Sequence, residues 1–149
     1  AVAAASSLAT NSNSNHAAGS AVKTAFVSVL SDGVTLVMHS TKGVQSTINM
    51  DLVGNELRLK AHKAVFATGT SSKKSYKLPL ESILFVEIGK GTSVLRGGAA
   101  ISVDEEVCFS LITVDTTYDF ETSSKIERDA FAQGFTMLLE ETKQLDALL

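Results

Sequence analysis

The spacing of apolar residues changes near Lys125, and this change constrains the fold more than any other feature of the sequence. Before Lys125, short runs of β-branched and aromatic residues are separated by turn signals such as Asp32-Gly33 and Gly54-Asn55. After it, apolar residues that include Phe131 and Phe135 recur at helical spacing. The sequence therefore predicts about seven short strands followed by one amphipathic helix of roughly five turns.

Local patterns add detail to this prediction. The runs on either side of Asp32-Gly33, within residues 23–40, are interpreted as two strands, and residues 57–60 alternate leucine with basic residues, as in a strand with one buried face. Pro79, the only proline, favours a strand edge or a strand start. Residues 124–127 match a helix capping box. An antiparallel barrel of about seven strands leaves one end open, and an amphipathic helix can close it.

The composition fits one globular domain and excludes several functional classes. The chain has 149 residues, 44% of them hydrophobic, and a net charge of −3, which gives no reason to expect nucleic acid as a partner. One cysteine, Cys108, excludes an internal disulfide and a cysteine-based zinc cluster. No apolar run approaches the roughly 18 to 20 residues of a membrane-spanning helix.

Residues 1–22 are predicted to form a low-complexity, extended tail ahead of a domain at residues 23–149. The first 20 residues are mostly Ala, Ser and Asn and carry no acidic or basic side chain apart from one histidine. Such a segment gains order mainly by lying along another surface, which predicts contact with a protein partner. The start AVAAASS is similar to the end left after removal of an organelle transit peptide, and an arbitrary boundary explains it equally well.

The order of strands and helix, together with several short phrases, resembles a pleckstrin homology (PH) domain, in particular the PH module of phosphoinositide-specific phospholipases C. The phrases are LSDGVTLVMHS for the first strand, NELRLK for the third, LPLESILFVEIGKGT after a variable loop, EVCFSLITV and TYDFET for the sixth and seventh, and ERDAFAQGFTMLLEE for the helix. The resemblance covers roughly residues 25–142. It implies a mainly β fold, a seven-stranded antiparallel barrel capped by one C-terminal helix.

The residues that hold lipid headgroups in this family are replaced here. Phosphoinositide-binding members carry Lys and Arg along the first two strands and the loop between them, where charge-assisted hydrogen bonds hold the phosphates. Met38 and Ser40 stand at the corresponding first-strand positions, and residues 45–47 include no arginine. Only His39 and Lys42 remain nearby. Because three lost charged hydrogen bonds lower affinity by about a thousandfold or more, the usual lipid pocket is predicted to be non-functional.

A basic run between residues 60 and 77 is the strongest local signal for a binding surface. It contains no acidic residue and can form a patch that binds a membrane or an acidic protein. It can also be a solvated strand edge, where lysines protect against aggregation. The candidate lipid-binding or partner-binding residues are His39, Lys42, Lys60, His62, Lys63, Lys73, Lys74 and Lys77.

No pattern indicates catalysis, a metal or a cofactor. The glycine-rich stretch at residues 89–98 lacks the spacing of a phosphate-binding loop, and the histidines do not show metal-ligand spacing. Cys108 lies in an apolar strand, where a small buried hydrophobe is expected. Leu145, Leu148 and Leu149 extend the helical stripe, either to complete the core or to contact a neighbour. The neighbour is favoured because capping a PH-type barrel takes only about three to four helical turns.

These observations predict a non-catalytic binding or scaffold module, an accessory subunit that docks on a larger assembly through its tail and its barrel surface. A processed terminus would place that assembly in an organelle, with a plastid membrane complex such as a photosystem as one specific candidate. Otherwise the chain is expected in the cytoplasm. The alternative is a peripheral membrane module that binds anionic lipids or phosphoinositides through Lys42 or the basic run.

Overall fold

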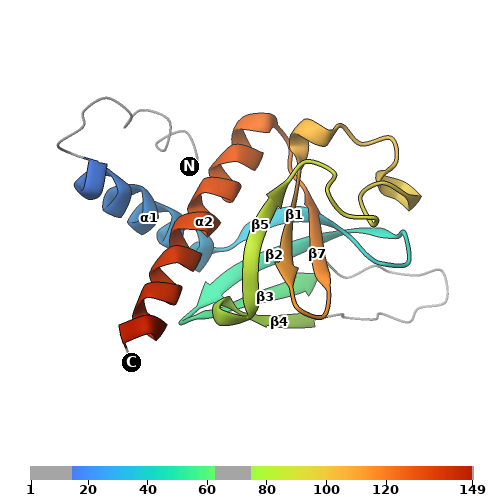
Figure 1. Cartoon of the computed structure of the whole chain (residues 1–149). Helices are drawn as coiled ribbons and strands as arrows, with labels where there is room; N and C mark the ends of the chain where they lie inside the picture. Colours follow the sequence, from blue (N-terminus) through green and yellow to red (C-terminus); the bar gives the residue numbers. More distant parts are fainter. Residues whose placement is uncertain (1–14, 63–74, 149) are drawn as a thin grey trace.

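The fold consists of seven strands between two long helices, shown in Figure 1 for a computed structural model that describes residues 15–62 and 75–148. Short 3-10 helices lie at Leu80–Ser82 (η2), Gly98–Ala100 (η3) and Glu105–Val107 (η4). The helices and strands are α1 (Asn15–Asp32), β1 (Val34–His39), β2 (Gln45–Val53), β3 (Glu56–Ala61), β4 (Ser75–Pro79), β5 (Ile83–Ile88), β6 (Cys108–Thr113), β7 (Thr117–Glu121) and α2 (Lys125–Leu148).

All seven strands pair antiparallel in one sheet, in the order β4-β3-β2-β1-β7-β6-β5. Figure 1 shows β2, β3 and β4 crossing β5 and β7 steeply, so the sheet folds around an interior. The two edges of the sheet are β4 and β5, and Pro79 ends β4, which confirms its predicted edge position. The seven strands and the helix that follows them confirm the predicted architecture.

Stacked aromatic rings join α2 to the sheet. Phe109 of β6 stacks on Phe120 of β7 with 5.2 Å between ring centroids, and on Phe131 of α2 with 5.7 Å. Phe135 lies one turn further along α2 and is completely buried. Each aromatic ring buries a large apolar area, and these rings fix α2 to the sheet together with the buried Leu138 and Leu139 of the same helix.

The start of α2 follows the predicted cap in part. The Ser124 hydroxyl accepts the backbone N–H of Glu127 at 3.1 Å, as an N-cap residue should. The Glu127 carboxylate does not return to Ser124. Instead it accepts a hydrogen bond of 2.8 Å from the hydroxyl of Ser123. The boundary of the helix was therefore predicted correctly, while one of the two contacts of the capping box is replaced.

Residues 15–32 form a helix, which corrects two expectations. The sequence predicts a strand before Gly33 and an extended tail through residue 22, but both regions contribute to α1. Val22 and Leu30 are buried, and Phe26 between them packs edge-on against two phenylalanines of α2, so the buried positions follow a helical period. Packing of this kind overrides the weak strand preference of β-branched residues. Gly33, with φ of +94°, ends the helix, and the turn signal therefore marks a helix end and not a hairpin.

The contact between α1 and α2 depends on the absence of a side chain at Gly134. A Cβ atom there would overlap the ring of Phe26, and Val22 is buried within the chain itself. Val22 is therefore buried by packing within this chain, and its burial gives no support to the predicted contact of the tail with a partner. Residues 1–14 of the predicted tail lie outside the described residues.

Candidate binding surfaces

A small hollow lies between the end of β1, the start of β7 and the start of β4. It is near the strand positions that carry lipid-binding cations in PH domains, the family that the sequence resembles. Its volume is about 160 Å³, and residues 38–41, Tyr76 and residues 116–118 line it. Met38 is buried and Ser40 is half-buried, so these positions present a thioether and a hydroxyl group. Among the described residues, no Lys or Arg contributes to the lining. In the part of the chain that the structure describes, the hollow therefore offers mainly hydroxyl groups and no Lys or Arg to a phosphorylated headgroup.

His39, one of the predicted binding residues, is buried on the outer face of the sheet. The residue is only 3% exposed, and its Nε2 lies 3.0 Å from Oε1 of Glu121. Asp119, which faces His39 in the register of β1 and β7, is also buried. Its carboxylate accepts hydrogen bonds from three hydroxyl groups, those of Thr92, Ser110 and Thr117. These side chains form a polar cluster on the outer face of β1, β7 and β6.

The connection between β5 and β6, residues 89–107, covers this polar cluster and is called the covering segment here. Thr92 of the segment bonds to Asp119, and Leu95 packs against Cys108 of β6. At the far end, Gly98 approaches the β1–β2 turn so closely that a Cβ on it would lie 2.6 Å from the Cα of Gly43. The covering segment therefore holds the β1–β2 turn in place. In lipid-binding PH domains, which the sequence resembles, this turn carries basic side chains.

The predicted basic residues are distributed over several parts of the molecule. Lys60 and Lys77 are exposed on the outer face of β3 and β4, and Arg58, opposite Lys77 in the register, shares that face. Arg58 is paired with Asp51 of β2 by hydrogen bonds of 2.8 and 3.0 Å, and these raise the pKa of the guanidinium. The structure thus brings Lys60 and Lys77 onto one surface.

The remaining predicted residues do not join that surface in any way that the structure describes. Lys42 is exposed on the β1–β2 turn, and His62 is exposed just after β3. Lys63, Lys73 and Lys74 lie outside the described residues.

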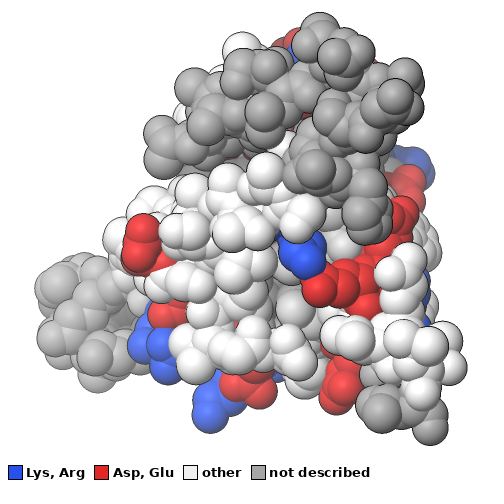
Figure 2. Space-filling model, turned by 90° about the vertical axis from the view of Figure 1, so that its left-hand side faces the viewer, with Lys and Arg blue, Asp and Glu red and all other residues white. Residues whose placement is uncertain are grey.

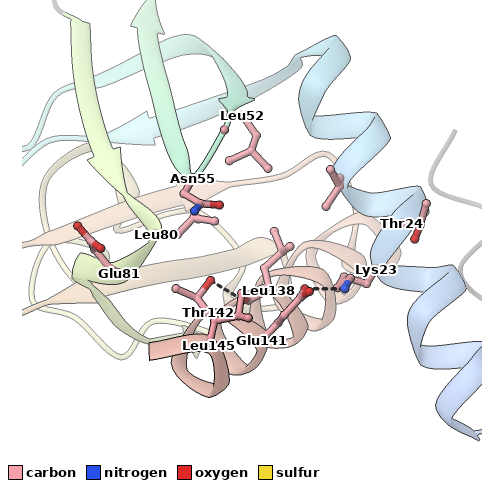
Figure 3. Close-up of a pocket in the computed structure, with 12 residues that line it drawn as sticks. Lys23, Thr24, Leu52, Asn55, Leu80, Glu81, Leu138, Glu141, Thr142 and Leu145 are labelled. Carbon is pink, nitrogen blue, oxygen red and sulfur yellow. Dashed lines mark hydrogen bonds and ion pairs between the residues drawn. The ribbon is translucent and has the colours of Figure 1, made fainter. Parts of the chain in front are cut away.

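A larger groove opens on the helical side of the molecule, with a volume of about 390 Å³ (Figure 3). It is formed by α1, α2, the β2–β3 hairpin and η2, which are far apart in the sequence. Figure 3 shows Leu52 and Leu80 on the sheet side of the groove and Leu138 and Leu145 on α2. The apolar residues that line it are Val27, Leu52, Leu80, Leu138 and Leu145.

Charged residues surround this apolar floor. Lys23 of α1 and Glu141 of α2 form an ion pair of 2.5 Å across one side of the groove, and Glu81 of η2 is exposed on another side. Leu145 is 56% exposed and Leu148, one turn beyond it, is 84% exposed. The leucines at the end of the helical stripe, Leu145 and Leu148, are the only sequence pattern that indicated a contact surface near this groove. The groove itself was missed, because three of its four walls come from other elements.

No metal or nucleophilic centre emerges from the rest of the described structure. Within residues 15–62 and 75–148, no group of three or more His, Cys, Asp or Glu side chains is placed to hold a metal ion. Burial raises the pKa of the Cys108 thiol, which keeps it protonated and unreactive. Among the described helices, none combines the length and apolar character needed to cross a membrane.

Comparison with known proteins supports the fold. No family model matches the sequence, and no curated protein matches it. Solved structures do match: Inner Membrane Complex Sub-compartment Protein 1 (ISP1) from Toxoplasma gondii is 14% identical, with 80% of this chain and 92% of that chain covered and a TM-score of 0.60. ISP3 from the same organism is 11% identical, with 83% and 86% covered and a TM-score of 0.54.

A third similar structure is a PH domain from the protein TgAPH, 17% identical, with 82% of this chain and 91% of that chain covered and a TM-score of 0.51. These structures do not bear on the finer resemblance to the PH module of phospholipases C. At such low identity the likeness concerns the fold alone: this chain has a PH-like fold, a seven-stranded antiparallel sheet closed by a C-terminal helix.

Proposed function

We propose that this chain is a non-catalytic binding module that docks on a protein partner, as an accessory subunit of a larger assembly. The observation that carries the proposal is the difference between the hollow at the strand ends and the groove on the helical side. The hollow at the strand ends has no Lys or Arg in its described lining, while the groove on the helical side has an apolar floor and few charges. Protein partners are recognised mainly through apolar anchors, and phosphoinositides mainly through cations.

The similar structures support a binding role in general terms, because a PH domain is among them. Two of them are sub-compartment proteins of an inner membrane complex, which favours an assembly that lies beside a membrane. The comparisons give no support to a plastid assembly. The proposal therefore keeps the accessory subunit and leaves the organelle open.

Sedimentation with lipid vesicles tests this function. The full chain is mixed with phosphatidylcholine vesicles and with the same vesicles containing a phosphorylated phosphoinositide. We expect equal and low binding to both, because no Lys or Arg among the described residues lines the hollow to hold the headgroup. Strong binding to the phosphoinositide vesicles that disappears as salt is raised would contradict the proposal.

The shared exposed face of Lys60 and Lys77 favours a second candidate, a peripheral membrane module that binds anionic lipids without headgroup specificity. The double variant Lys60→Glu, Lys77→Glu separates this from the first proposal. If the second candidate is correct, the original chain binds phosphatidylserine vesicles and the double variant does not. If the first is correct, neither protein sediments above the level seen with neutral vesicles.

A further inference from the structure

The groove on the helical side has a specific shape that limits what can occupy it. Its α2 wall runs from Leu138 to Leu145, which corresponds to about 10 Å or two helical turns. Opposite this wall lie one turn of α1, at Lys23–Val27, and the end of the β2–β3 hairpin. The floor is therefore about as long as two turns of helix, the length over which one helix presents apolar side chains at positions i, i+4 and i+7.

The backbone around the groove offers little to an extended peptide. The sheet edge strands β4 and β5 do not contribute to the lining, apart from η2 that follows β4. At the hairpin, the Asn55 carbonyl already accepts the N–H of Leu80 at 2.8 Å. An added strand needs a row of free N–H and C=O groups, so the groove favours the side chains of a helix.

The charges around the groove are negative on balance. Lys23 is the one cation among the lining residues, and the carboxylate of Glu141 already neutralises it. Glu81, on the η2 wall, makes no ion pair with another described residue. Figure 2 shows the face that carries the helices: acidic side chains form a band along the right-hand side, and a group of Lys and Arg side chains lies at the lower left with further acidic side chains beside it. A positively charged occupant is therefore complementary to the groove.

From these observations we infer that the groove binds a basic amphipathic helix of a partner protein. The helix would place its main apolar side chain on Leu145, which is 56% exposed, beside the small parts of Leu80 and Leu138 that reach the surface at 3% and 6% exposure, and Lys or Arg beside Glu81. This inference rests on the proposed function, since it names the kind of partner that the binding module takes. It adds the position, the secondary structure and the charge of the recognised segment.

Fluorescence anisotropy with two synthetic peptides tests the inference. The first is a fluorescein-labelled helix of roughly four turns with leucines on one face and lysines on the other. The second has every lysine replaced by glutamate. With the full chain, we expect the lysine peptide to bind at least about tenfold more tightly than the glutamate peptide at low salt.

Matched variants locate the binding. Glu81→Lys should weaken binding of the lysine peptide by about fivefold or more, while Glu105→Lys, the same charge change at an exposed residue of η4, should alter it by less than about twofold. Leu145→Glu should reduce it by about tenfold, and Val114→Glu, at an 81% exposed site in the β6–β7 turn, should not. Circular dichroism of each variant checks that the fold is kept. If Leu145→Glu unfolds the chain, the pair Glu81→Lys and Glu105→Lys decides alone.

Three results would overturn the inference in distinguishable ways. If both peptides bind equally, or Glu81→Lys and Glu105→Lys have the same effect, the charge of the occupant is wrong. If the glutamate peptide binds more tightly and Leu145→Glu abolishes its binding, the groove takes an acidic helix and the protein-docking function stands. If neither peptide responds to the groove variants, this site is not the docking surface, and vesicle sedimentation alone decides between protein and lipid.

Discussion

The hollow at the strand ends and the groove between the helices differ in what their linings can recognise. The hollow is small and lined by hydroxyl groups, and the covering segment holds the β1–β2 turn beside it. The groove is more than twice as large, and leucines from distant elements make up its floor. The same PH-like fold therefore has a poor site near the strand positions where lipid-binding PH domains carry their cations, and a better site where the two helices meet. The fold alone therefore does not determine which face of the molecule binds a partner.

Removing the ring of Phe131 should have the largest effect, because it loosens α2, which forms one wall of the groove. Phe131 is 3% exposed and stacks on Phe109, so the change to alanine leaves a cavity between α2 and the sheet. We expect Phe131→Ala to lower the free energy of unfolding by about 3–5 kcal/mol in urea denaturation. Ile126→Ala is the control, because Ile126 lies on the same helix and is 69% exposed. Its effect should stay within about 0.5 kcal/mol. A loss below about 1 kcal/mol for Phe131→Ala would mean that α2 does not cap the sheet as described.

Removing the carboxylate of Asp119 should have an intermediate effect on the opposite side of the molecule. Asp119 accepts the hydroxyl of Thr92 at 2.5 Å and those of Ser110 and Thr117 at 2.7 Å. Asp119→Ala leaves these hydroxyls without their acceptor, and we expect a loss of about 1–3 kcal/mol. Hydrogen exchange should then become faster in the covering segment, residues 89–107, and remain unchanged in α1.

Asp115→Ala is the matched control for Asp119, since Asp115 is exposed in the turn between β6 and β7. It should be nearly neutral. Equal exchange rates in the covering segment of the Asp119→Ala variant and of the original chain would show that this segment is held by its apolar contacts, such as Leu95 on Cys108, and not by the polar cluster.

The strands could be predicted from the sequence because their signals are local. Gly54-Asn55 marks the β2–β3 turn, and the alternation at residues 57–60 marks the buried and exposed faces of β3. The Ser124 cap also depends only on neighbouring residues. Such features are decided within a few residues, so a single sequence contains enough information for them.

The helix α1, the groove and the burial of His39 depend on contacts between distant segments, and local patterns do not contain them. The run that ends at Leu30 has the composition of a strand, and it becomes a helix because Phe26 fits against Gly134, more than a hundred residues later. His39 is enclosed by a covering segment that approaches Gly43 through Gly98. The sequence makes His39 a candidate because it is a basic residue beside positions that bind lipid in PH domains. Only the tertiary packing shows that its side chain is buried and lies within hydrogen-bond distance of Glu121.

The ion pair between Lys23 and Glu141 should matter least for stability and still change the groove. Its side chains are 26% and 44% exposed, so water screens the attraction and the pair contributes at most about 1 kcal/mol. We expect Lys23→Met to shift the unfolding midpoint only slightly, because methionine keeps the apolar stem against α2. Glu141, however, loses its counter-ion and adds a free negative charge to the groove. Binding of the lysine peptide should become up to about threefold tighter, and addition of salt should remove the gain.

If the stability of the chain and its binding of the peptide both stay unchanged, the Lys23–Glu141 pair contributes to neither. If binding weakens instead, Lys23 itself contacts the occupant, and the negative charge of the groove is not what selects the partner.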